Sequence, residues 1–359
     1  MNEKQMQAAR DAMIEWLEHP HELGAAPAEI ECAGTFELHD MTYYLFRYRR
    51  EADGDWLLGV CGGYEDGDLE HCGHVYSEME EYDESTAVEK ATAMVELIRS
   101  YWMEQAKLAE ERKEKAGAFV GFVLLSEDEW DKEQLIRDLK EEWDIDAAED
   151  DDEAGDDSLA FNVGDMIAVA SIMHCPVPDG EAEANAENNY MWPEAVNVAK
   201  AHKAQITVAV LGKEASLVER GELYVKLAAC CCRQKRATGI YTSGTVFEPS
   251  FFYKFADMMK GGEFPIFNLI WFGLYRSERG VCGYTYGMEC FGKDEMEVLD
   301  ADAEPSDVQN FLSSMAAYVI EYDVTLNDGE TIGFSAEDKH AITRSEGAAL
   351  PGMTLKIEY

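Results

Sequence analysis

The sequence predicts an α+β protein with two domains: a small helix–antiparallel sheet–helix domain followed by a larger mixed α/β sandwich domain. Its 359 residues are too many for one ordinary hydrophobic core. Early in the chain, short strand patterns follow one another as in an antiparallel meander, whereas the later strands are continuous apolar runs of the kind covered on both faces. A stretch of charged residues and alanine separates the two patterns and predicts the domain boundary.

Residues 1–107 form the predicted small domain. Apolar residues three and four apart indicate its first helix, and alternation of side chains indicates its strands. Thr86 and Glu89 have the spacing of a capping box at the start of a second helix, which continues into a charged helical linker over residues 108–117. The other elements expected are a helix over Glu3–Glu18 and strands over Glu29–Leu38, Met41–Arg50, Trp56–Cys61 and Cys72–Ser77.

Residues 118–359 form the predicted larger domain. Helix starts are expected at the capping boxes Ser126–Glu129 and Ser216–Glu219 and at Pro193 and Pro305. Residues 146–157 contain eight acids in twelve positions, and we expect an acidic loop there. Its acids form a block without the alternation that a calcium loop requires. The strands expected are Ala118–Leu125, Leu159–Met173, Ile206–Leu211, Gly239–Thr242, Phe267–Tyr275, Cys282–Met288, Glu295–Leu299, Thr331–Ser335 and Thr354–Glu358.

The composition excludes several classes of partner. A formal net charge of −43 produces a surface that repels nucleic acid and acidic membranes and favours basic partners, although such acidity is also a common adaptation for solubility. The apolar runs are shorter than the about 20 residues that cross a bilayer, and the first residues are unlike a secretion signal. We therefore expect a cytoplasmic protein with reduced cysteines.

The C-terminal part of the chain carries a set of short motifs. They are Gly283-Tyr-Thr-Tyr-Gly-Met288, Phe291-Gly292, Glu295-Met-Glu297, Phe311–Val319 and Asn327–Ser335, with Cys175-Pro-Val-Pro178 and Trp192-Pro193 upstream. Through them, the chain from roughly Gly117 onward resembles a bacterial family known only by its catalogue label, domain-of-unknown-function family 4261. A weaker similarity links it to suppressor-of-fused-like domains, some bacterial members of which are regarded as toxin-immunity proteins. The resemblance implies no catalytic residues.

The densest cluster of reactive side chains lies in the first domain. It consists of Cys61, His71, Cys72 and His74, with Cys32 and His39 nearby in sequence. Zinc prefers thiolate and imidazole ligands, so these four residues are the candidate metal ligands, although their spacing matches no common zinc motif. Cys72 and His74 share a strand face and are the candidate catalytic pair of nucleophile and base. The interpretation that we prefer is that the cysteines are structural residues beside a Gly-Gly turn, with no metal site and no catalytic residue.

Other patterns have a structural explanation that we prefer. His174-Cys175 is another histidine–cysteine pair, which we expect at the end of a buried strand. The triplet Cys230–Cys232 cannot converge on one metal ion within a helix and is expected to fill the core. Gly283, Gly287 and Gly292 lack the spacing of a nucleotide loop and are expected at bulges or at close approaches of the backbone. Glu295 and Glu297 share a strand face and could act as acid and base, but a solvent-facing edge is the default.

These observations predict a non-enzymatic protein-binding module, of the immunity type, whose partner is a basic protein. They predict no cofactor, nucleic acid or membrane as a partner. The alternative is a small hydrolase, or a thiol- or metal-dependent enzyme, that uses the region of Cys61, Cys72 and His74. Thiol reactivity separates the two functions, because a nucleophilic cysteine has a depressed pKa and is alkylated quickly near neutral pH.

Overall fold

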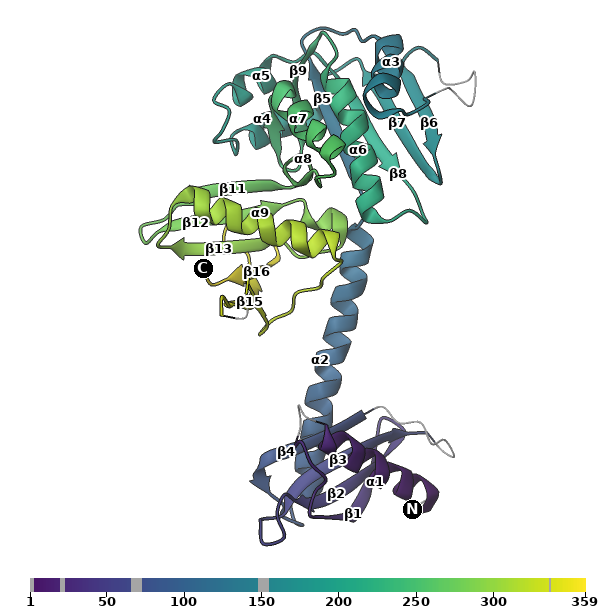
Figure 1. Ribbon diagram of the computed structural model, residues 1–359, viewed down its shortest axis with the longest axis vertical. Coiled ribbons are helices and arrows are strands. Elements are labelled where there is room, and N and C mark those ends of the chain that lie inside the picture. The colour runs from purple at the N-terminus through teal and green to yellow at the C-terminus, as the bar shows by residue number, and fades with distance from the viewer. Residues whose placement is uncertain (1–2, 20–22, 66–72, 148–154, 336) are drawn as a thin grey trace. The chain divides into compact units, whose positions relative to one another are not determined.

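The chain divides into two compact units, Met1–Leu108 and Ala109–Tyr359, and the division falls within one helix. The computed structural model describes residues 3–19, 23–65, 73–147, 155–335 and 337–359, and of residues 73–80 and 111–115 it describes the backbone. Helices and mainly antiparallel sheets make up both units, which confirms the predicted α+β class (Figure 1). None of the described helices combines the length and the apolar character needed to cross a membrane.

The smaller unit is an antiparallel sheet with a helix on each face (Figure 1). Its elements are α1 (Glu3–Glu18), β1 (Glu29–Leu38), β2 (Met41–Arg49), β3 (Leu57–Tyr64), β4 (Gly73–Glu81) and the first part of α2 (Ala87–Lys115), and the strands pair in sequence order. Strand β2 shows how the sheet is covered. Tyr44 and Phe46 pack with α1, whereas Tyr43 and Leu45 pack with α2, as the two-residue period of a strand requires.

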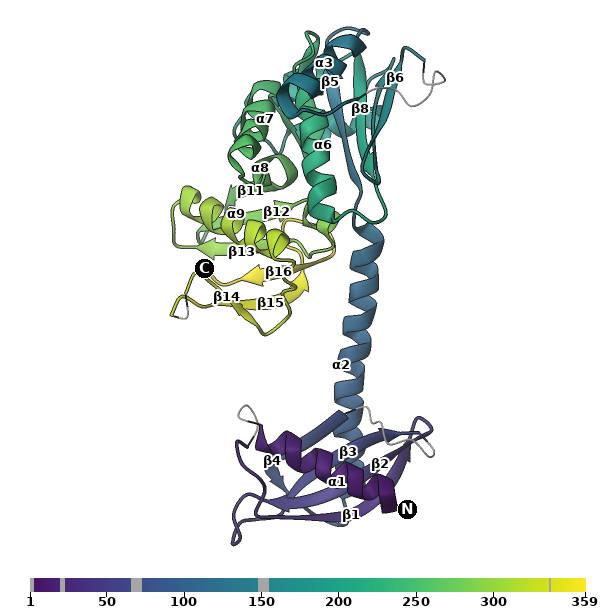
Figure 2. The ribbon, with the colours of Figure 1, turned by 45° about the vertical axis from the view of Figure 1, so that its right-hand side comes forward.

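The first sheet of the larger unit is antiparallel throughout its described pairs. Its order is β10 (Thr245–Phe247), β9 (Ala237–Thr242), β5 (Phe119–Leu125), β8 (Ala204–Leu211), β7 (Met166–Met173) and β6 (Ser158–Val163). Helix α6 (Leu217–Cys232), with α3 (Lys132–Trp143) beside it, covers one face (Figure 2). The other face is covered over β9 and β10 by α4 (Glu181–Ala186) and α5 (Ala195–Ala201), which follow η1 (Pro178–Gly180).

The second sheet of the larger unit carries the C-terminal part of the chain. Its order is β11 (Trp271–Arg276), β12 (Val281–Tyr286), β13 (Met296–Ala301), β16 (Met353–Ile357), β15 (His340–Glu346) and β14 (Thr331–Ile332). Strands β13 and β16 pair in parallel, and helix α9 (Pro305–Glu321) packs across β11, β12 and β13. The remaining helices are α7 (Pro249–Ala256), η2 (Asp257–Gly261), α8 (Ile266–Leu269) and η3 (Met288–Phe291). The predicted sandwich is therefore two helix-covered sheets that share one continuous core.

Three expected strands are wrong in detail. The single strand expected over Leu159–Met173 is the hairpin β6–β7, because Gly164 adopts a positive φ of 63° and turns the chain. The start of the strand expected over Phe267–Tyr275 is helix α8, and only the later residues form β11. The strand expected over Thr331–Ser335 is shortened to β14, which pairs with β15, a strand that the sequence pattern does not reveal.

One of the expected capping boxes forms and two do not. Ser216 Oγ accepts a hydrogen bond from Glu219 N, and the Glu219 carboxylate accepts one from Ser216 N, which confirms the box at α6. Helix α3 instead begins at Lys132, with Asp131 as its cap. Thr86 Oγ1 is buried and has no hydrogen-bond partner among the described residues, so it does not cap α2. The spacing of a box is shared by many loops, and only the local backbone decides which of them forms.

The box at α6 gives the first testable prediction. Ser216→Ala leaves a helix-terminal amide without its acceptor, so the free energy of unfolding should fall by about 1 kcal/mol. Urea unfolding combined with hydrogen exchange of the α6 amides measures this loss. Ser126→Ala is the matched control, because Ser126 donates only to Arg236 O, at 3.3 Å, and caps no helix. Equal losses in the two variants would contradict the assignment.

Candidate functional site

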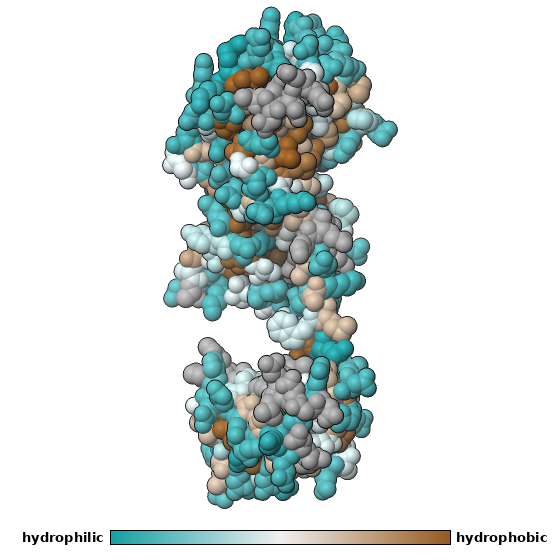
Figure 3. Space-filling view, turned by 90° about the vertical axis from the view of Figure 1, so that its right-hand side faces the viewer, coloured by the Kyte–Doolittle hydropathy of each residue, from teal (hydrophilic) through white to brown (hydrophobic). Residues whose placement is uncertain are grey.

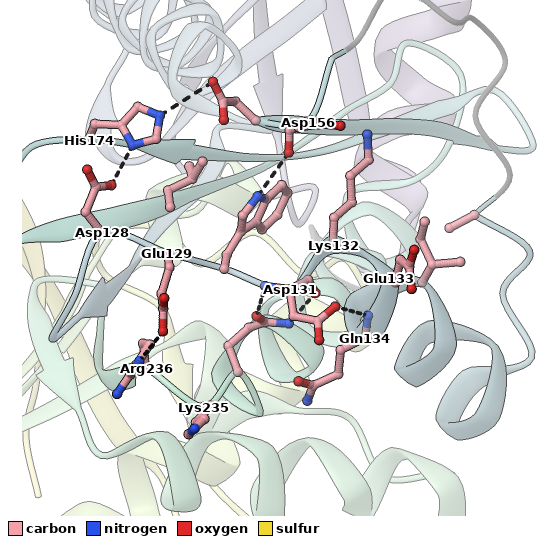
Figure 4. Close-up of a pocket in the computed structure, with 16 residues that line it drawn as sticks. Asp128, Glu129, Asp131, Lys132, Glu133, Gln134, Asp156, His174, Lys235 and Arg236 are labelled. Carbon is pink, nitrogen blue, oxygen red and sulfur yellow. Dashed lines mark hydrogen bonds and ion pairs between the residues drawn. The ribbon is translucent and has the colours of Figure 1, made fainter.

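A cleft of about 960 Å³ lies at one edge of the first sheet in the larger unit (Figure 4). Its walls come from the loop after β5, the residues before β6, the end of β7 and the residues before β9. Neighbouring antiparallel strands place the end of one strand beside the start of the next, so these four segments meet where the strands end, on the same side of the sheet. The topology therefore brings together residues from Asp128 to Arg236, which the sequence does not group.

Carboxylates dominate the walls of this cleft. The acidic lining residues are Asp128, Glu129, Asp131, Glu133, Asp156 and Asp157, and the basic ones are Lys132, His174, Lys235 and Arg236. The acidic loop predicted at 146–157 borders the cleft through its two ends, while residues 148–154 lie outside the described part of the chain. The cleft is consequently a hollow with an excess of negative charge.

His174 stands between two carboxylates at the back of the cleft (Figure 4). Its Nδ1 lies 2.5 Å from Asp128 Oδ1, and its Nε2 lies 3.5 Å from Asp157 Oδ2. These two carboxylates raise the pKa of His174 above its usual 6.5, with the Asp128 hydrogen bond as the larger cause. Because both nitrogens face acceptors, the doubly protonated imidazolium fits the site best. A histidine held in this way bridges two walls as a cation and leaves neither nitrogen as a base.

Arg236, Lys132 and Trp130 hold the remaining walls in place. The Arg236 guanidinium contacts Glu127 at 2.7 Å and Glu129 at 2.5 Å. Lys132 Nζ donates to Gly155 O at 2.8 Å, and Trp130 Nε1 donates to Asp156 O at 3.1 Å. These bonds tie the loop after β5 to the residues before β6 and β9. The half-buried ring of Trp130 thus lines an acidic hollow, where aromatic faces attract cationic groups.

The lining of this cleft consists mainly of charged side chains. Among the described lining residues there is no serine, threonine, cysteine or tyrosine that could act as a nucleophile. Cys175 follows His174 and is exposed, but it does not line the cleft. Across the described part of the chain, no group of three or more histidine, cysteine or acidic side chains is placed to hold a metal ion. What remains is a set of fixed carboxylates that can receive ammonium or guanidinium groups.

The structure describes only part of the cluster predicted in the first domain. Cys61 is buried under α1, with Sγ 3.6 Å from Tyr64 Oη, and burial raises its pKa to about 11. Cys61 and His74 are partners in the register of β3 and β4. His71, Cys72 and the side chain of His74 lie outside the described residues.

The two residues near that cluster in sequence have other partners. His39 Nε2 lies 2.8 Å from Glu96 Oε1 of α2. Cys32 is half-buried, and burial raises its pKa. Cys32 packs against the same apolar cluster as Cys61, whereas His39 pairs with α2 and is not part of that cluster.

The cysteine triplet and the motif glycines lie in packed surroundings. Cys230, Cys231 and Cys232 are buried in the core, and burial raises the pKa of each thiol, to about 12 for Cys230. Gly283 lies at a register shift between β12 and β13. A Cβ atom on Gly283 would come within 2.9 Å of α9 side chains, so the glycine allows that helix to pack closely.

Glu295 and Glu297 correct the expectation of a solvent-facing edge, because both are buried. Burial raises the pKa of Glu295 to about 7, although Thr285 Oγ1 and Gly287 N each donate to it at 2.7 Å. Burial also acts to raise the pKa of Glu297, but hydrogen bonds outweigh it and the pKa is lowered. Its largest partners are Ala348 N and Lys356 Nζ. The described contacts give the two carboxylates separate partners, so they fix loops and do not form an acid–base pair.

Comparison with known proteins agrees with part of the resemblance. Residues 284–358 match the family model described as a domain of unknown function (DUF4261). The match covers the C-terminal motifs, which lie in and around the second sheet, and leaves out the motifs near Cys175 and Trp192. The similarity to suppressor-of-fused-like domains gains no support from it and stays a prediction. No curated protein and no solved structure matched the chain.

His174 provides a testable prediction. Because Asp128 and Asp157 raise its pKa, the imidazolium adds stability at low pH, and this contribution is lost as the pH rises through the raised pKa. Asp128→Asn should lower the pKa of His174 towards 6.5, and Asp157→Asn should lower it less, because Asp157 is the smaller cause. Nuclear magnetic resonance of the imidazole nitrogens measures both values. A pKa that is unchanged in Asp128→Asn would contradict the bridge.

The buried thiol provides another prediction. A cysteine whose pKa is about 11 has about 100-fold less thiolate near neutral pH than one at the usual 9.0. Iodoacetamide should therefore alkylate the exposed Cys175 long before Cys61 in the folded protein, and mass spectrometry of digested samples measures the two rates. Unfolded protein is the control, in which the difference should disappear. Fast labelling of Cys61 in the folded protein would support the thiol-enzyme alternative.

Proposed function

We propose that the protein is a non-enzymatic binding module whose acidic cleft receives a basic segment of another protein. The observation that carries the proposal is the cleft itself, in which carboxylates that follow β5 and carboxylates that precede β6 are held in place by Arg236 and His174, while Lys132 fixes the backbone at Gly155. Preorganised carboxylates bind cationic groups without the cost of ordering loops first. Its cytoplasmic location remains a prediction.

Electrostatics would act on such a partner at two ranges. The net charge of −43 would attract a basic protein from a distance and speed the encounter. At contact, lysine or arginine side chains would enter the cleft, and a guanidinium could stack on Trp130. A protein that itself handles nucleic acid has the basic surface required, which is why an immunity-type role, with the cleft imitating phosphate charge, fits this proposal.

The alternative from another class is an enzyme that uses Cys61, Cys72 and His74. The buried, protonated thiol of Cys61 weighs against a nucleophile at that position. Cys72 lies outside the described residues. Alkylation of the whole protein therefore tests whether Cys72 is a reactive nucleophile. A Cys72 thiol that reacts much faster than Cys175 near neutral pH would favour the enzyme over the binding module.

Partner capture tests the proposal directly. The protein, immobilised and exposed to a lysate of its native host at low and moderate salt, should retain a basic protein that is lost as salt rises. Exposed charges are screened beyond about 10 Å at 0.1 M salt. A variant with Asp128→Asn, Glu133→Gln and Asp156→Asn should bind this partner at least about tenfold more weakly, since each lost charge-assisted bond is worth about 1 kcal/mol or more.

The matched control removes the same charge elsewhere. Glu278→Gln, Asp302→Asn and Glu304→Gln replace three exposed acids that do not line the cleft. This control should bind like the unmodified protein. Equal weakening in both triple variants would show that the charge acts in general and not through the cleft. Capture of only neutral or acidic proteins would overturn the proposal.

A further inference from the structure

One face of the first sheet in the larger unit is covered along only part of its width. Helix α6 lies over β9, β5, β8 and β7 on one side, whereas α4 and α5 on the other side cover β10, β9 and the end of β5, where Leu124 packs with them. The face opposite α6 is therefore open over β8, β7 and β6 and over the start of β5. Apolar surface is open to solvent on this unit in the space-filling view (Figure 3).

The strand register shows which residues share this open face. One row runs from Val120 on β5 through Ala209 and Val169 to Ala160 on β6. The next row joins Leu211, Ile167 and Asn162. The exposed fractions are 44% for Val120, 45% for Ile167 and 56% for Leu211, whereas their α6-facing neighbours are buried. Large apolar side chains therefore form a ridge that no described element covers.

This face carries no ionisable side chain. Its other members on the same strands are Ser158, Ser171, Met173 and Thr207, read from the two-residue period of each strand, and the buried Gln205 marks the limit of the open area on β8. In a chain of which 29% of the residues are charged, an uncharged face spanning several strands stands apart from the rest of the surface. A sheet normally buries such a face against another layer.

We propose that this open face packs against the same face of a second copy of the protein. Charge selects this occupant. Every copy carries −43, so two copies can pack closely only through a surface that buries no carboxylate. This face offers no charge complementary to a basic partner, which would bind more favourably in the acidic cleft.

The shape of the face also suits a two-fold pair. Two sheets pack at a separation of about 10 Å when side chains of one enter spaces on the other. Under a two-fold axis, the Leu211–Ile167 ridge of one copy can lie over the small residues Ala209, Ser171 and Ala160 of the other. Four strands about 4.8 Å apart give a footprint on the order of 400 Å² per copy. The pair then buries less than the about 1,200 Å² of stable interfaces, so the dimer is weak and reversible.

The test is sedimentation velocity of the whole protein over a range of concentrations at low and high salt. A dimer should appear as concentration rises, and salt should strengthen it, because screening removes the repulsion between two acidic copies. Salt weakens binding in the acidic cleft, so the two interactions are distinguished by the sign of their salt dependence. A protein that stays monomeric at every concentration in high salt overturns the proposal and assigns the face to another occupant.

Ile167→Lys tests the location of the interface. It should abolish the dimer, because each lysine ammonium would be buried without a partner against the small uncharged residues of the other copy, even though the substitution lowers the net negative charge. Met353→Lys is the matched control, since Met353 is also a strand residue, is also 45% exposed, and lies in the second sheet. It should leave association unchanged or slightly stronger. Circular dichroism confirms that both variants fold, and a dimer that persists in Ile167→Lys overturns the proposal.

Discussion

The larger unit depends on strand β5, whose second half is paired on both sides and covered on both faces. Residues 122–125 pair with β8 on one side and with β9 on the other, so this half of the strand is not an edge of the sheet. Phe119, Val123 and Leu125 turn towards α6, and Leu124 turns towards α4 and α5. The loop that follows this strand forms one wall of the acidic cleft. The start of the strand borders the open sheet face. Both proposed binding surfaces are thus placed by one strand.

Basic residues are scarce, and some of them lie where acids converge or are buried. With 30 lysines and arginines against 73 acids, most carboxylates must remain exposed to water. Arg236 and His174 are used where acids from different segments converge, and Lys356 is used where a carboxylate is buried. Acidic and uncharged surfaces are in this way separated on the same unit. They would respond to salt in opposite directions, because one attracts opposite charge and the other is opposed by like charge.

The segment that matches the family is held together by its buried carboxylates. Glu297 receives amides of the loop at Ala348 and Ala349 together with the Lys356 ammonium, and so joins β13, β16 and the loop before it. Glu295 performs a similar task for the turn at Gly287. Removing one partner from a buried pair leaves an uncompensated charge, which is far costlier than losing a surface pair. Structural stabilisation alone therefore explains why the Glu295-Met-Glu297 motif contains two glutamates, without any catalytic role.

The sequence by itself determined the fold class, most of the helices and strands, and the resemblance of the C-terminal part to a family of unknown function. These features follow from local periodicity, from signals such as the box at Ser216, and from short motifs, all of which lie within a few residues of chain. Only the tertiary structure decided where the cleft lies, because Asp128, Asp157, His174 and Arg236 are brought together by antiparallel pairing across a hundred residues. It also decided that Glu295 and Glu297 are buried and that one sheet face is open. Burial and cover depend on which other segments pack nearby, and the pattern along a single strand cannot specify them.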